Sequence, residues 1–523
     1  MSSREASWGA TSRGLAGSWT VFWLAFVAFT AVAVSWALAS PIFSVPDESA
    51  HVIKAIGQVH GEVVGHREAG VRHLVVDLPQ QFSFSSQTMC FVYHSEVPAS
   101  CGIEVGDPRG ATEAASWVST YNPIYYYLVG WPSLFLGGPA GIYAMRIASA
   151  ILGGLLFAAA FQAATASRRA WWLPAGLGFL ALPMVGYLNG SVNPNGVEIV
   201  SAVALTAGLL GLLGTFDPAR FEPSALRRGH LWAIVTVAAI LLANARALGP
   251  LWVVVIVALC FVACGWQSVR GLFVTARSYI WLAIIAAGGL FSIGWTLAGG
   301  SLSGQAEKAD APLVDAGFLQ GATYMVRATP RFAVEALGYF GWFDAPLPGY
   351  AFWFAVAALA VLAVLALATA RRREFVVLVI AVGVAALLPV LVQASSVHQT
   401  GIIWQGRYGL FLYLSVILLF AWVLSRGGGD RIAFLSVRLT WTIGALLWIF
   451  GALAFLLTLR RYVIGNAEPI GQMLKDPQWQ PPLGWPVLLA LFLIASAAFV
   501  VLVGAAAQRL ARSDASIREL TTT

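Results

Sequence analysis

The segment VPDESAH places two carboxylates and an imidazole close together, a few residues after a long apolar run. Pro46, Asp47 and Glu48 are typical of the first turn of a helix, and His51 lies four residues after Asp47 on the same helix face. A carboxylate and an imidazole on one face can take a proton from a substrate hydroxyl and orient it. The two acids can equally serve only to stabilise the helix dipole. We take Asp47, Glu48 and His51 as candidate catalytic residues.

Other polar residues that fit a binding site stand near the ends of later apolar runs. An arginine at the membrane edge, as in IYAMRIAS, ARALGPLW and WQGRYGL, needs a partner such as a carboxylate or a lipid phosphate. The amides of VNPNGVEI and the aromatic and acidic residues of GWFDAPLP add polar and aromatic groups that could contact a ligand. Each motif also has a plain alternative, namely an Asn-Pro turn, an arginine reaching lipid headgroups or an interfacial aromatic belt. The candidate binding residues are Arg146, Asn193, Asn195, Arg246, Trp342, Asp344, Trp404, Gln405, Arg407 and Tyr408.

The composition indicates which elements must position these residues. The chain is 59% hydrophobic and 11% charged, whereas soluble domains carry about 25% charged residues. Apolar runs of about 17–25 residues, long enough for transmembrane helices, recur along the chain. We therefore predict an all-α, polytopic membrane helix bundle. The twelve predicted spans are residues 19–39, 141–166, 171–188, 196–214, 231–245, 249–265, 279–297, 350–370, 375–393, 408–424, 439–459 and 485–505.

The arginine clusters predict how this bundle is oriented across the membrane, because Lys and Arg collect in cytoplasmic loops. All clusters fall inside if the stretch 123–137, which is short and contains a proline, is an outer helix that does not span. Two large loops, 40–122 and 298–349, are then extracytoplasmic, and the VPDESAH helix is juxtamembrane with its apolar side on the bilayer surface. The predicted parts are a cytoplasmic N-terminus (1–18), a transmembrane module (19–424), C-terminal transmembrane helices (425–505) and a cytoplasmic tail (506–523).

The same orientation explains the charge and the cysteines. The net charge of +7 belongs to the cytoplasmic side of a membrane protein, and no basic stripe with interleaved aromatics points to nucleic acid. Cys90 and Cys101 share the first outer loop, where the environment is oxidising, so we expect a disulfide rather than two free thiols. Cys260 and Cys264 lie one turn apart in a span and are expected to be packing residues.

The five motifs VPDESAH, VNPNGVEI, ARALGPLW, GWFDAPLP and WQGRYGL, in this order, resemble those of actinobacterial multi-pass membrane proteins catalogued as a domain of unknown function (DUF 2142). The resemblance extends from about residue 40 to residue 424. That family is similar in turn to the GT-C membrane glycosyltransferases, in which an acid in the first outer loop acts at the membrane surface. Asp47 stands at that place with Glu48 beside it, and a long outer loop after the seventh span is also typical of GT-C enzymes.

The resemblance implies an inverting glycosyltransferase on the extracytoplasmic face of a bacterial plasma membrane, surrounded by membrane lipids. Its donor would be a polyprenyl-phosphate-linked sugar, and its acceptor a cell-envelope glycan or lipid. Asp47 would be the base, and Glu48 or His51 would orient it or the sugar. Arg246, Arg407 or Arg146 would stabilise the departing phosphate. The sugar would be held by Asn193, Asn195, Asp344 and Gln405, with Trp342 or Trp404 stacking on its ring.

No metal or cofactor is assigned with certainty, and a divalent metal stays an alternative. Asn193 and Asn195 stand where some GT-C enzymes carry metal-binding acids, and no P-loop or dinucleotide motif is present. Five of the seven histidines lie in the first outer loop, at spacings that match no standard zinc site: His51, His60, His66, His73 and His94.

Two further functions stay open. The chain could be a flippase or transporter of lipid-linked glycans, or a non-catalytic scaffold of envelope assembly. Transporters carry ionisable residues near the middle of their spans, where coupling takes place. The predicted span centres are nearly free of such residues, which favours chemistry at the outer interface.

Overall fold

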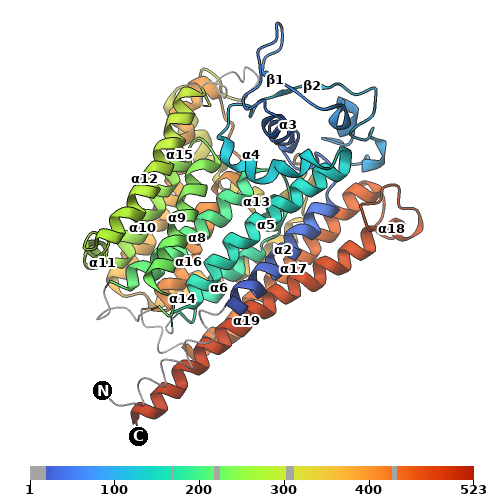
Figure 1. The fold of residues 1–523 in the computed structure, drawn as a ribbon. Helices are drawn as coiled ribbons and strands as arrows, with labels where there is room; N and C mark the ends of the chain where they lie inside the picture. Colours follow the sequence, from blue (N-terminus) through green and yellow to red (C-terminus); the bar gives the residue numbers. More distant parts are fainter. Residues whose placement is uncertain (1–18, 168–169, 217–223, 302–310, 427–432, 523) are drawn as a thin grey trace.

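The computed structural model describes residues 19–522, apart from 168–169, 217–223, 302–310 and 427–432. Helices packed side by side form one bundle, and the first large loop covers one end of it (Figure 1). Strands in the described residues are confined to two short antiparallel pairs, so the predicted all-α bundle is confirmed. The pairs are β1 (Leu74–Asp77) with β2 (Glu113–Ser116), and β3 (Tyr339–Phe340) with β4 (Ala345–Pro346).

Ten helical segments of the described chain are long and apolar enough to cross a membrane. Each has at least 18 residues, which at about 1.5 Å per residue approaches the thickness of the hydrocarbon core. Eight of the ten are single long helices, and the other two begin with a short turn, η7 (Gly349–Ala351) before α14 and η8 (Gly406–Gly409) before α16. They are α2 (Trp19–Ala39), α5 (Gly138–Thr165), α8 (Pro194–Gly214), α9 (Arg228–Ala245), α12 (Ala276–Ala298), α14 (Phe352–Thr369), α15 (Arg372–Thr400), α16 (Leu410–Leu424), α17 (Ala433–Ile464) and α19 (Trp485–Thr522).

Two of the predicted spans take a different form, so the predicted number of twelve is approximate. The first is α10 (Gly249–Cys264), an apolar helix of only 16 residues. The second, predicted at 171–188, is broken before Pro183, which lacks the N–H that would continue a helix and holds Leu182 in an extended conformation. Its pieces are α6 (Leu173–Gly178), η5 (Phe179–Ala181) and α7 (Pro183–Asn189).

The stretch 123–137 does not span, as predicted. It forms α4 (Pro123–Gly130) and the turn η4 (Trp131–Leu134), and an eight-residue helix reaches only about 12 Å. It packs against α3 (Glu48–Val59) at the loop end of the bundle (Figure 1). Nearly all of α3 is buried beneath α4 and the first loop, so the prediction that one side of this helix lies on the bilayer surface is wrong.

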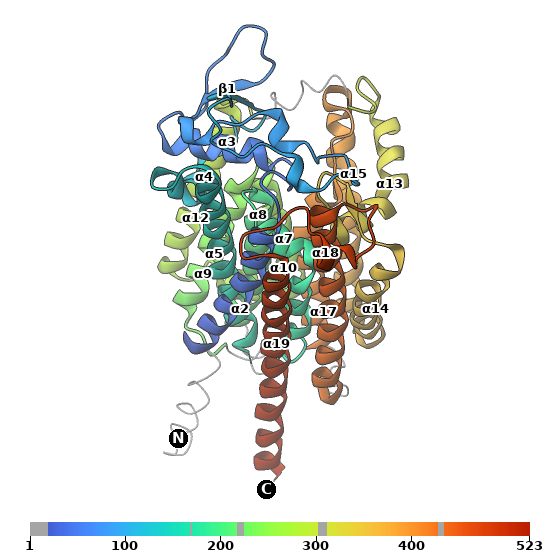
Figure 2. The ribbon, with the colours of Figure 1, turned by 90° about the vertical axis from the view of Figure 1, so that its right-hand side faces the viewer.

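The two large loops lie at the same end of the bundle, opposite the C-terminal end of α19 (Figure 2). The indole of Trp342 in the second loop donates a hydrogen bond to the carbonyl of Phe43 in the first, at 3.0 Å. Both termini of the described chain lie at the other end (Figure 1). The remaining elements are the long helix α13 (Phe318–Gly338) and the short η1 (Gln80–Phe82), η2 (Ser86–Met89), η3 (Ala99–Cys101), α11 (Trp266–Gly271) and α18 (Gln472–Lys475).

The first loop contains a disulfide that is anchored to α17. The structure pairs Cys90 with Cys101, whose Cα atoms are 6.1 Å apart. Within the ring that this bond closes, the carbonyl oxygens of Phe91 and Val97 accept hydrogen bonds from Arg461 of α17, at 2.7 and 2.8 Å. The ring is therefore held against α17 at the loop end of the bundle.

A buried ion pair fixes the start of α3. Glu48 and Arg146 of α5 are both 0% exposed, and Arg146 donates to the two carboxylate oxygens at 2.7 and 2.5 Å. Its other N–H groups donate to the carbonyl oxygens of Ala37, Ser40 and Pro41, around the end of α2. All five N–H donors of the guanidinium are thus satisfied. A buried ion pair offsets its desolvation only when its remaining groups are hydrogen-bonded in this way.

We expect Arg146→Met to destabilise the protein by about 3–5 kcal/mol, because Glu48 would remain as an unpaired buried charge. Thermal unfolding of the purified protein in detergent micelles measures the change. The control is Arg109→Met, which removes an exposed ion pair with Asp107 in the same loop and should leave the unfolding temperature nearly unchanged. Equal unfolding temperatures for the two variants would contradict the role given to the buried pair.

Candidate functional site

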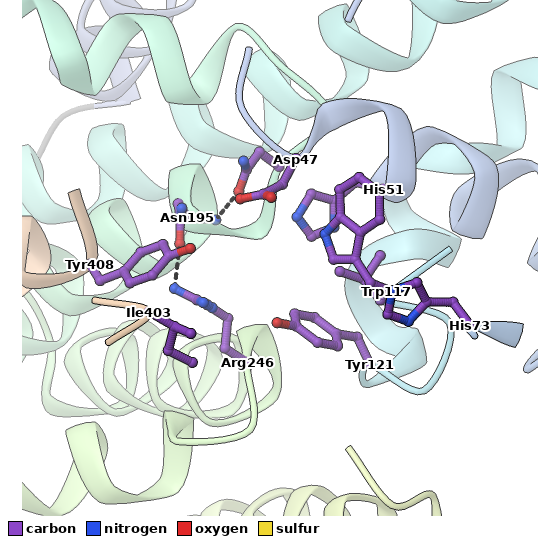
Figure 3. Close-up of a pocket in the computed structure, with 11 residues that line it drawn as sticks. Asp47, His51, His73, Trp117, Tyr121, Asn195, Arg246, Ile403 and Tyr408 are labelled. Carbon is purple, nitrogen blue, oxygen red and sulfur yellow. Dashed lines mark hydrogen bonds between the residues drawn. The ribbon is translucent and has the colours of Figure 1, made fainter. Parts of the chain in front are cut away.

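A polar cavity, here called the chamber, lies at the loop end of the bundle (Figure 3). It encloses about 590 Å³ of space, counted to its open mouth. Its walls come from the start of α3, the first loop, the start of α8, the end of α9 and the segment before α16. Residues far apart in the sequence therefore meet there. The lining residues are Asp47, His51, His73, Trp117, Val118, Tyr121, Asn193, Asn195, Arg246, Ile403 and Tyr408.

Asp47 lies in the chamber wall directly before α3. Its backbone is left-handed, with φ of 66°, which is uncommon outside glycine but tolerated by Asp. The Arg407 guanidinium contacts its carboxylate, and the two side chains are 6% exposed for Arg407 and 22% for Asp47. Arg407 does not line the chamber but a smaller neighbouring cavity. The predicted phosphate contact is thus a residue that holds Asp47 in place.

His51 is buried in the chamber wall, and its Nδ1 forms a hydrogen bond with the hydroxyl of Tyr126, at 2.8 Å. The pKa of His51 is lowered to about 3, mainly by burial; the charge of Asp47 opposes this change, and the positive charges of Arg246 and Arg407 add to it. The imidazole is therefore neutral at ordinary pH. It can orient a hydroxyl group without adding a charge to the chamber.

Arg246 is the guanidinium that faces the chamber. It follows the last residue of α9 and donates to Oδ1 of Asn195, at 2.9 Å (Figure 3). Its guanidinium carbon lies 4.1 Å from the ring centre of Tyr408, a cation–π contact. The amide of Asn193 caps α8 through the Asn195 N–H and donates to the carbonyl of Pro46, at 3.1 Å. Asn195 thus orients Arg246, and Asn193 ties α8 to the residue before Asp47.

A second, larger cavity, here called the groove, adjoins the chamber. It encloses about 1080 Å³ between the start of α10 and the end of α15. Arg246, Ile403 and Tyr408 line both cavities, so the two meet at these side chains. The groove has apolar walls in part, and polar groups stand along α15. Its lining residues are Glu198, Arg246, Ala247, Leu248, Trp252, Val392, Gln393, Ser395, Ser396, Gln399, Thr400, Ile403, Trp404 and Tyr408.

Four predicted site residues line neither the chamber, nor the groove, nor the smaller cavity beside Arg407, and their predicted roles are corrected. Glu48 and Arg146 satisfy one another and the neighbouring backbone inside the protein, so neither can act on a substrate. Asp344 is 5% exposed and paired with Arg461 at 2.7 Å, and it lines neither cavity. Trp342 packs between the two loops. These four residues hold together the helices and loops around the two cavities.

The remaining predicted residues are divided between the cavities. Trp404 lines the groove, and Tyr408 stands at the junction. Gln405 lies with Arg407 in the smaller cavity of about 260 Å³ on the far side of Pro46. Several lining residues were not predicted, among them His73, Trp117, Tyr121 and Glu198. The first three lie in loop stretches without a distinctive motif, whereas Glu198 belongs to the VNPNGVEI motif and was not selected.

A group that could hold a metal ion lies elsewhere in the first loop. Ligand atoms of Glu62, His66 and Asp77 lie within 4.8 Å of one another, and no other such group occurs in the described ranges. Glu62 already hydrogen-bonds His66, at 2.8 Å, and this bond is the main cause of the raised pKa of His66. None of the three residues lines the chamber, so the group has no part in the site described above.

A family described as "Predicted membrane protein (DUF2142)" matches residues 29–418. The chain belongs to this family. With its apolar helices it is a multi-pass membrane protein. The matched region contains every residue that lines the chamber and the groove, whereas α17 and α19 lie beyond it. Searches among curated proteins and among solved structures give no match.

The low pKa of His51 predicts how stability depends on pH. The unfolded chain binds a proton at His51 near pH 6.5, whereas the folded protein binds it only near pH 3. Stability should therefore fall as the pH decreases from about 6.5 towards 3, and His51→Gln should flatten this decrease. Thermal unfolding at several pH values measures it, and the exposed His94→Gln is the control. A His51→Gln protein with the wild-type pH dependence would refute the assignment.

Proposed function

We propose that this protein is a membrane glycosyltransferase that transfers a sugar from a polyprenyl-phosphate donor to a hydroxyl of a cell-envelope glycan or lipid. One observation carries the proposal. Arg246 stands where a groove with partly apolar walls meets a polar chamber that contains Asp47 and His51. A ligand that suits this pair of cavities has an apolar chain, an anionic group and a polar head, in that order. The resemblance to GT-C enzymes points to the same class of ligand.

The polyprenyl chain would lie in the groove, between the outer ends of α10 and α15. Leu248, Trp252 and Val392 supply apolar contacts there. Its phosphate would bind Arg246, whose guanidinium is oriented by Asn195 and Tyr408. The sugar would then lie at the junction, with its anomeric carbon facing the chamber. Such a donor arrives through the lipid bilayer and requires no nucleotide-binding loop.

The acceptor hydroxyl would reach the anomeric carbon from the chamber side. Asp47 takes the hydroxyl proton as the oxygen forms its bond to the anomeric carbon. The bond between that carbon and the phosphate oxygen breaks, and its electron pair remains on the phosphate beside Arg246. A single displacement of this kind inverts the anomeric configuration. Arg407 pairs with Asp47 and orients it, and neutral His51 orients the hydroxyl.

Asp47→Asn tests this function directly. The amide has nearly the same shape but cannot accept the proton, so turnover should fall about 10²- to 10⁴-fold. The assay measures release of polyprenyl phosphate from sugar-labelled polyprenyl-phosphate arabinose, mannose and glucose by the purified protein with an envelope extract as acceptor. Asp107→Asn, on the surface of the same loop, is the matched control. Unchanged turnover in Asp47→Asn would exclude it as the base.

A flippase of lipid-linked glycans is the second candidate, because the groove is the larger of the two cavities and could bind such a lipid without chemistry. The two functions differ in the product. Movement of the intact sugar-lipid across vesicles, without release of polyprenyl phosphate, would favour the flippase. If the protein shows neither sugar transfer nor lipid movement, and its loops bind partner proteins, the result would favour a scaffold.

The proposed reaction takes place outside the cytoplasm, on the plasma membrane of a bacterium. The arginine distribution and the disulfide in the first loop support this orientation. In intact cells, a membrane-impermeant maleimide should label Glu104→Cys in the first loop. It should label Arg372→Cys, at the start of α15, only after the membrane is permeabilised. The reverse pattern would place the chamber in the cytoplasm.

A further inference from the structure

Glu198 is a buried acid of the groove that the mechanism above does not use. It lies on α8, three residues after Asn195 and therefore on the same side of the helix. Only 2% of it is exposed, yet it lines the groove. Asn195 lines the chamber instead, and Arg246 lines both cavities. The α8 helix thus presents one oxygen-bearing side chain to each cavity, with Arg246 at their junction.

The carboxylate of Glu198 makes no hydrogen bond within the described part of the chain. The other buried acids of the loop end are all bonded: Glu48 to Arg146, Asp344 to Arg461, and Glu335 to Arg331 and the backbone N–H of Gly406. A buried carboxylate without hydrogen bonds is costly, and native proteins rarely keep one without a purpose. Arg246 acts on Glu198 through its charge, but its side-chain hydrogen bonds go to other residues.

The two buried polar side chains that α15 contributes to the groove wall, Gln393 and Thr400, are bonded to other groups. The amide of Gln393 donates to the carbonyl of Gly401 and accepts from the N–H of Ile403, at 2.9 and 3.1 Å. The hydroxyl of Thr400 donates to backbone carbonyls of its own helix end. Donors for Glu198 can come from a ligand that lies beside Arg246, where the groove meets the chamber.

We propose that Glu198 binds hydroxyl groups of the sugar carried by the lipid donor, and so selects the donor by its head. This inference rests on the proposed function, because it assumes a sugar next to the phosphate on Arg246. A carboxylate accepts two hydrogen bonds at once, which suits neighbouring hydroxyls of a sugar. It repels a bare anion, so it adds nothing for a lipid phosphate without a sugar. Glu198 is thus a specificity residue, and Asp47 on the chamber side remains the base.

The test compares the binding of two probes to the purified protein in detergent micelles: undecaprenyl phosphate, and the same lipid carrying arabinose, mannose or glucose. The wild type should bind one sugar-bearing lipid tenfold or more tightly than the bare phosphate, as expected for hydrogen bonds to a charged group. Glu198→Ala should remove this preference without weakening the binding of undecaprenyl phosphate, because the bare phosphate loses only a repelling charge. Glu198→Gln, which keeps one acceptor oxygen without the charge, should retain part of the preference for the sugar-bearing lipid.

Two controls separate the possible failures. Arg246→Ala should weaken the binding of all probes, and Glu113→Gln, an exposed change on β2, should alter none. If Glu198→Ala binds every probe as the wild type does, or weakens all of them equally, the role given to Glu198 is wrong while the donor class stands. If the wild type binds no polyprenyl phosphate at all, the proposed function fails and the inference fails with it.

Discussion

The ion pair between Glu48 and Arg146 determines where the rest of the site lies. It joins α3 and α5 through side chains, and it also holds the end of α2 through the Arg146 hydrogen bonds and the turn before α8 through Val192. Four parts of the bundle therefore share one pair of charges. Removing these charges from water is costly, and the cost is offset only because the guanidinium donors and the carboxylate oxygens are bonded. Asp47, the adjacent residue, takes its position from this arrangement.

Two neighbouring acids consequently have opposite surroundings. Glu48 points into the protein, where all its partners are supplied, while Asp47 has a left-handed backbone and lies in the wall of the chamber. Arg407, from the segment before α16, reaches Asp47 across the bundle. An acid held by a distant arginine keeps its orientation only when both parts of the fold are in place. The proposed chemistry thus depends on the packing of all the elements at the loop end of the bundle.

A second buried ion pair, Asp344 with Arg461, also holds the loop end of the bundle together. It connects the second loop with the disulfide ring of the first loop. The two pairs fix the loops, and the helices below leave the groove between α10 and α15. Three side chains line both the chamber and the groove, and Arg246 is the charged one among them. A rigid rim of loops above a groove that opens among helices suits a ligand that comes from the bilayer and reacts at its surface.

The sequence by itself determined the membrane class, most spans, the non-spanning stretch 123–137 and the motifs that line the chamber. These follow from local requirements, since a span needs about 20 apolar residues whatever its neighbours are. It could not distinguish Asp47 from Glu48, nor Arg246 from Arg146. Their types and spacing are alike, and the difference lies in partners brought from other helices. Only the tertiary structure decided which charges pair inside the protein and which, like Glu198, face a cavity without a partner.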